Sequence, residues 1–95
     1  MNKELKHYIR VFCRDNLRLL EGLRIDCKTY CENSEKRMYM LNKKIQKAKS
    51  VFERKQLNDL YEFQSHCVEK YVAKLEQVNI EIYEYEQLFA KNEKS

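Results

Sequence analysis

Thiols and imidazoles are the side chains of this sequence best suited to metal or redox chemistry. Cys27 and Cys31 are four residues apart, so on a helix they would share a face, and helical pairs of this spacing can bind metals. Structural zinc sites usually combine closer cysteine pairs with a characteristic gap, whereas the other candidates here are scattered. Those candidates are Cys13, Cys67, His7 and His66. We therefore expect no metal and no cofactor, and the pattern favours thiols that pack as small apolar groups in a reducing compartment.

Patterns that indicate catalysis are sparser still. The sequence contains no Gly-rich phosphate loop and no nucleophile elbow. Glu62 precedes His66 by four residues, which would bring the two side chains together on a helix, but a surface pair of this kind is usually structural. We expect no catalytic residues and predict that the protein is not an enzyme.

Composition indicates which elements must carry any site. The 95 residues include one glycine, Gly22, and no proline, so the residues that punctuate strands and hairpins are almost missing. Charged residues make up 36% and hydrophobic residues 43%, as in helices with one buried stripe. We predict a single all-α domain over residues 1–95, either an antiparallel helical hairpin or a three-helix bundle with coiled-coil packing. No apolar run approaches the roughly 18 residues of a membrane span, and we expect a cytoplasmic protein.

Turn signals divide the chain into three predicted helices. Asn33 and Ser34 compete for backbone hydrogen bonds, so residues 31–35 are the best turn candidate. The second junction stays open, because Ser50 has a capping-box partner three residues later, Asn58 offers a later break, and an unbroken helix also fits. With both breaks, the helices cover about residues 3–30, 35–55 and 58–90.

The last third of the chain carries the most regular pattern, which we call the 57–89 row. Its ten positions alternate spacings of four and three, and nine of them are apolar or aromatic, with Gln64 as the exception. At 1.5 Å per residue the row is about 50 Å long, so it needs another long helix beside it. We therefore predict that its apolar members bind protein, within the chain or outside it. They are Leu57, Tyr61, Val68, Tyr71, Leu75, Val78, Ile82, Tyr85 and Phe89.

Two further rows predict the faces that the earlier helices bury. The first is Leu5, Ile9, Phe12, Asn16, Leu19, Leu23, Cys27 and Tyr30. The second is Met38, Leu41, Ile45, Ala48 and Phe52. In the last helix, Leu60, Cys67, Val72 and Leu88 lie beside the 57–89 row. They widen its apolar surface beyond what one partner helix covers, which implies contact with more than one other helix.

Charge changes sign along the chain. Residues 1–30 carry seven basic and four acidic side chains, residues 31–56 carry eight and three, and residues 57–95 carry four and eight. This distribution favours antiparallel pairing of the acidic last helix with the basic middle one. Basic stripes also attract phosphate backbones, and Lys43, Lys44 and Lys47 are the candidate contacts. The net charge of only +4 and the absence of a nucleic-acid motif make that the weaker interpretation.

Together these observations predict a binding protein. We expect a non-enzymatic protein–protein interaction module, an adaptor or small chaperone that acts through coiled-coil helix faces and associates with itself. Its partner would be another protein or a second copy. The alternative is a nucleic-acid-binding helical protein that uses the basic stripes of its first and second helices. Binding that weakens sharply as salt rises would favour this alternative.

Overall fold

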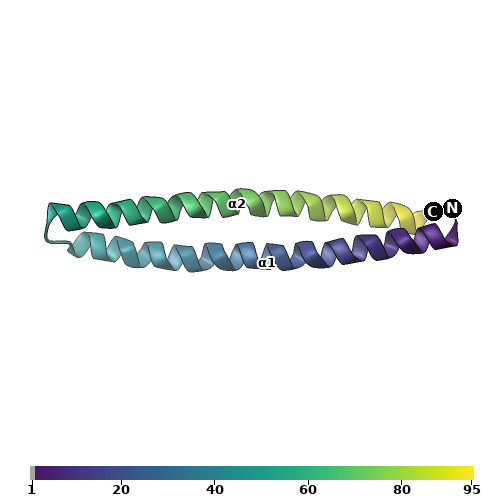
Figure 1. The fold of residues 1–95 in the computed structure, drawn as a ribbon, viewed down its shortest axis with the longest axis horizontal. Coiled ribbons are helices and arrows are strands. Elements are labelled where there is room, and N and C mark those ends of the chain that lie inside the picture. Colours follow the sequence, from purple (N-terminus) through teal and green to yellow (C-terminus); the bar gives the residue numbers. More distant parts are fainter. Residues whose placement is uncertain (1) are drawn as a thin grey trace. The chain divides into compact units, whose positions relative to one another are not determined.

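The computed structural model describes residues 2–95, and these residues form two long helices. Helix α1 covers Lys3–Lys47 and helix α2 covers Val51–Lys94 (Figure 1). Residues 48–50 connect them, and the described part of the chain contains no strand. The all-α prediction is therefore confirmed. The three-helix bundle is wrong, because there are two helices instead of three.

Both helices begin at side-chain caps. At the start of α1, the backbone N–H groups of Glu4 and Leu5 donate to Oδ1 of Asn2, over 2.7 and 3.3 Å. At the start of α2, the backbone N–H of Glu53 donates to Oγ of Ser50 over 3.0 Å. Such caps satisfy backbone donors that have no partner within the helix. Of the open possibilities for the second junction, the break at Ser50 is the one that forms.

The turn predicted at residues 31–35 is wrong, because α1 continues through it. Asn33 and Ser34 each cost less than about 0.7 kcal/mol in a helix interior relative to alanine, and neither glycine nor proline stands nearby to end the helix. Ser34 is fully buried, at 0% exposure. Packing of neighbouring α1 residues against α2, such as Tyr30 on Tyr71, outweighs the weak local preference of Asn33 and Ser34 for a turn.

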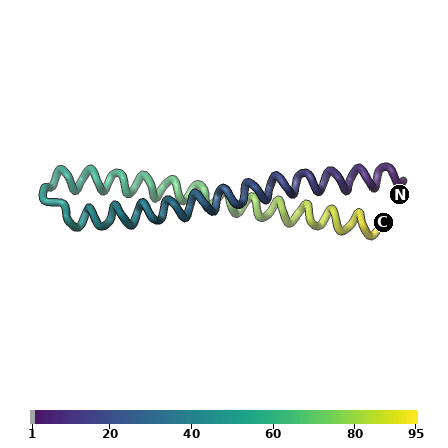
Figure 2. Tube along the Cα trace, turned by 90° about the horizontal axis from the view of Figure 1, so that it is seen from below, coloured from purple at the N-terminus to yellow at the C-terminus, as the bar shows by residue number. Residues whose placement is uncertain are grey.

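The chain divides into two compact units, each built from a segment of both helices. Unit 1 consists of Met1–Asp26 and Leu75–Ser95, and unit 2 consists of Cys27–Lys74. Within unit 1 the start of α1, in purple, runs antiparallel beside the end of α2, in yellow, in both views (Figures 1 and 2). Unit 2 is a helical hairpin around the connection at residues 48–50. The prediction of one domain over residues 1–95 stays a prediction.

The 57–89 row is the least exposed face of α2. All ten positions are buried or half-buried, and the same spacing continues to Asn92, which is 3% exposed. In unit 2, the ring of Tyr71 stacks on Tyr30 of α1 with the centroids 3.9 Å apart. In unit 1, the ring of Tyr85 lies 6.0 Å from that of Phe12. The row is thus turned toward α1 within each unit.

The row predicted for the start of α1 needs a correction. Leu5, Phe12 and Leu19 are exposed, Leu19 to 73%. The next residue along the chain is buried or half-buried in each case. The spacing between the less exposed residues of α1 then alternates between three and four as far as Ser34. The observed row is Lys6, Ile9, Cys13, Asn16, Leu20, Leu23, Cys27, Tyr30 and Ser34. The second predicted row holds from Met38 to Ala48, whereas Phe52 is exposed.

Candidate functional site

The two units bury few large side chains and leave many exposed. Only five hydrophobic residues among residues 2–95 are buried, and two of them are cysteines and one is alanine. Sixteen large hydrophobic residues in the same part of the chain are exposed. Where exposed apolar side chains gather into a groove, they typically mark a site where another protein binds. The exposed apolar side chains are therefore the candidate binding surface.

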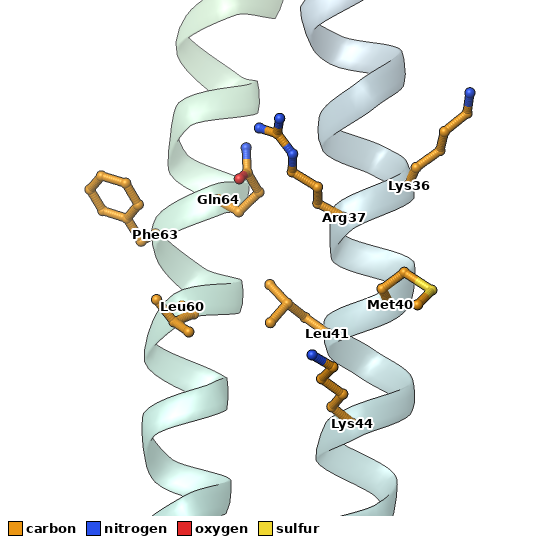
Figure 3. Close-up of a pocket in the computed structure, with 8 residues that line it drawn as sticks. All are labelled: Lys36, Arg37, Met40, Leu41, Lys44, Leu60, Phe63 and Gln64. Carbon is orange, nitrogen blue, oxygen red and sulfur yellow. The ribbon is translucent and has the colours of Figure 1, made fainter.

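A groove in unit 2 is lined by three of them, which come from both of its helical segments. Met40 and Leu41 of α1 and Leu60 and Phe63 of α2 provide the apolar lining of a cavity of about 430 Å³. Met40 and Leu60 are each 55% exposed and Phe63 is 68% exposed. In Figure 3, Leu41 lies between the two helices, whereas Phe63 points away from α2. The groove thus presents apolar surface to any partner that approaches it.

Basic side chains surround this groove. Lys36, Arg37 and Lys44 complete its lining with Gln64, and no acidic residue lines it. Figure 3 shows the end of Lys44 in the space between the helices and Lys36 directed away from α1. We call the groove and these three residues the basic face of unit 2. Apolar contacts with a positive rim suit an amphipathic acidic segment.

A second groove, in unit 1, has the opposite charge. Phe12 of α1 and Tyr85 and Leu88 of α2 line a cavity of about 570 Å³, together with Gln77. Its charged lining consists of Glu81 and Glu84, without any basic residue. We call this groove the acidic face of unit 1. The ring of Tyr8 stacks on Phe12 with the centroids 6.4 Å apart, and Tyr8 is itself exposed.

Elsewhere in unit 1, charges neutralise one another. Nε and Nη2 of Arg10 donate to the two carboxylate oxygens of Glu93 over 2.7 and 2.9 Å. This hydrogen bond, together with the positive charge of Arg10, holds the pKa of Glu93 below its ordinary value, although desolvation of the carboxylate opposes the shift. Arg24 forms a second ion pair with Glu21. Among residues 2–95 these are the only ion pairs, so the charges of the acidic and basic faces have none within their own chain.

Tyr71 and Tyr85, two of the residues predicted to bind protein, already contact α1 within their own units. Val78 and Ile82 are buried in unit 1, at 3% and 4% exposure. In unit 2, Nε2 of Gln64 donates to the hydroxyl of Tyr30 over 3.5 Å, beside the stacked ring of Tyr71. The 57–89 row therefore holds each unit together. Whether its members also bind a partner stays a prediction.

The cysteines are all free. Cys13 and Cys27 are buried, and Cys31 and Cys67 are half-buried. Burial raises the pKa of the Cys13 thiol, and burial with nearby acidic groups raises the pKa of the Cys31 thiol, so less of each is present as reactive thiolate. No group of three or more metal-ligating side chains occurs within the described residues.

The candidate nucleic-acid contacts Lys43, Lys44 and Lys47 are exposed on α1 in unit 2. Nζ of Lys43 lies 4.5 Å from the ring centroid of Tyr39, and Lys44 belongs to the basic face. Their contact with nucleic acid stays a prediction.

Of the apolar residues that line the two grooves, the sequence pattern indicated Leu60 and Leu88, which lie beside the 57–89 row, but not Met40 and Phe63. Met40 and Phe63 could have been identified as large apolar side chains that lie outside every predicted row.

Comparison with known proteins identifies no relative. No model of a protein family, no curated protein and no solved structure matches the chain. Neither helix contains a stretch, within the residues described, that is long and apolar enough to cross a membrane.

Proposed function

We propose that this protein is a non-enzymatic protein–protein interaction module, an adaptor or small chaperone that presents helix faces to its partner. The observation that carries the proposal is the imbalance between five buried hydrophobic residues and sixteen exposed large ones. A coiled coil that has all its partner helices buries most of its large apolar residues. Here, sixteen large apolar residues lie outside the buried rows and are exposed.

The basic face of unit 2 is the proposed contact. It offers the exposed side chains of Met40, Leu60 and Phe63, and buried apolar anchors of this size contribute most of the binding energy in protein interfaces. The 57–89 row then has a supporting role, because it fixes the two helical segments that form the groove. Nucleic acid remains the alternative partner, through Lys43, Lys44 and Lys47.

Site-specific photo-cross-linking in cells that express the protein tests this proposal. A photoreactive phenylalanine analogue replaces Phe63 in the groove. A matched control carries the analogue at Asn42, a residue of α1 that is exposed like Phe63 but does not line the groove. We expect discrete protein adducts from position 63 and few from position 42. Adding Leu60→Asp should remove these adducts, because a carboxylate would then replace an apolar contact.

Three results would count against the proposal. Equal adducts from both positions would show non-specific contact, and adducts that resist Leu60→Asp would place the interface elsewhere. Adducts that disappear after nuclease treatment would favour the nucleic-acid alternative. Far-UV circular dichroism of the Leu60→Asp variant verifies that the helices remain formed.

A further inference from the structure

The acidic and basic faces are complementary in both charge and apolarity. The basic face combines Lys36, Arg37 and Lys44 with exposed apolar side chains, and it contains no carboxylate. The acidic face combines Glu81 and Glu84 with Phe12 and Leu88, and it contains no cation. One chain therefore carries both halves of a matched pair of surfaces.

Neither face has its charge satisfied within its own unit. Glu81 accepts only a hydrogen bond of 3.4 Å from Nε2 of Gln77, and no carboxylate lies within ion-pairing distance of Lys36, Arg37 or Lys44 in the described part of the chain. Arg10 and Glu93, by contrast, already pair and have no need of a partner. The charges on the two faces thus remain available for contacts with another molecule.

We propose that the basic face of unit 2 docks on the acidic face of unit 1 of a second copy of this chain. The inference rests on the proposed function and names a partner for it. Leu60 and Phe63 of one copy would cover Phe12 and Leu88 of the other, while the lysines and the arginine meet Glu81 and Glu84. Such a contact joins two different surfaces, so each copy offers one donor face and one acceptor face.

A second copy is favoured over an unrelated acidic protein because its acidic face already combines the opposite charge with exposed apolar side chains. Opposite charges across such an interface select the partner and speed encounter, whereas two basic faces or two acidic faces repel. The rim charges are exposed, so salt must weaken the association. These features make the proposal testable by exchanging the charges of the two faces.

The experiment measures molar mass by analytical ultracentrifugation in reducing buffer, over a wide range of concentration and at low and high salt. The basic-face variant carries Lys36→Glu, Arg37→Glu and Lys44→Glu. The acidic-face variant carries Glu81→Lys and Glu84→Lys. A control with matched loss of positive charge changes three exposed lysines that line neither groove. These are Lys28→Glu, Lys55→Glu and Lys70→Glu.

We expect the wild-type mass to rise from 11.7 kDa with increasing concentration and to fall again at high salt. Each face variant alone should associate more weakly by about 100-fold, because like charges then meet across the contact. An equimolar mixture of the two variants should associate again, since the two native faces still match each other and the two exchanged faces now carry opposite charges as well. The control variant should behave as the wild type does.

The remaining outcomes overturn the inference. A wild type that stays at 11.7 kDa at every concentration shows that the faces do not join two copies. Variants that associate as strongly as the wild type would show that self-association uses another surface. A mixture that fails to associate would show that the two faces do not recognise each other through opposite charges. If a variant loses helicity, glutamine in place of each exchanged charge repeats the test. Cross-links from position 63 to a different protein would leave the proposed function intact in each case.

Discussion

Replacing Ser34 by alanine is expected to stabilise the protein, although it removes a polar group. Ser34 lies in the middle of α1 at 0% exposure, and its Oγ has no hydrogen-bond partner among the described residues. A buried hydroxyl without a partner costs about 1–3 kcal/mol in lost hydration. Alanine also has the higher helix propensity, by about 0.5 kcal/mol.

The expected gain is somewhat smaller than the sum of these effects. Removal of the hydroxyl leaves a small void, which offsets a few tenths of a kcal/mol, roughly, at the usual cost of cavity volume. We therefore expect the free energy of unfolding to rise by about 1–3 kcal/mol. For a chain of this length, each kcal/mol corresponds to an increase in Tm of about 4–8 °C.

Urea and thermal unfolding, followed by circular dichroism, measure this change. Asn33→Ala is the matched control, because Asn33 is the exposed neighbour of Ser34 in the same helix and its intrinsic helix propensity is similar. The control should gain only the propensity difference. If Ser34→Ala gains no more than Asn33→Ala, or loses stability, the hydroxyl has a partner in solution and the reasoning is refuted.

Two more predictions concern a cap and an ion pair. Ser50→Ala should lower the free energy of unfolding by about 1 kcal/mol in urea titrations, because the N–H of Glu53 loses its acceptor; an unchanged value would mean that the cap is dispensable. Arg10 lowers the pKa of Glu93 from its ordinary 4.5, so the stabilisation from this pair is complete above that pH and is lost as the pH falls through the lowered pKa. Carboxyl NMR titration should therefore give a higher pKa for Glu93 in Arg10→Gln than in the wild type, and equal values would show that the pair does not form in solution.

The buried row of α2 could be predicted because its pattern admits one interpretation. From Leu57 to Phe89 the spacing alternates without a slip, and every position proves buried or half-buried. The start of α1 admits two rows, one through Phe12 and Leu19 and one through Cys13 and Leu20. Side-chain size favours the first, but the contact with α2 selects the second. The spacing of apolar residues within one helix does not indicate which of two such rows will contact the other helix.

The turn at residues 31–35 and the groove failed prediction for related reasons. Asn33 and Ser34 carry a weak local signal for a turn, and packing of neighbouring α1 residues such as Tyr30 against α2 overrides it. The basic face draws its lining from both helices, Met40 from α1 and Phe63 from α2, which depends on the register between the helices. The charge pattern predicted that basic residues 31–56 pair with the last helix. In unit 2 the part of this segment that belongs to α1, residues 31–47, does pair with α2, whereas residues 51–56 are themselves part of α2.

The connection at residues 48–50 also sets an order of folding. Unit 2 joins segments that are neighbours in sequence around this connection, whereas the two segments of unit 1 are separated by the whole of Cys27–Lys74. Closing so long a loop in an unfolded chain is entropically costly, and the cost largely disappears once unit 2 has formed. Contacts between near neighbours also form faster than distant ones. The capped connection at Ser50 is therefore the natural nucleus, from which helix pairing proceeds residue by residue until the N- and C-terminal segments meet last.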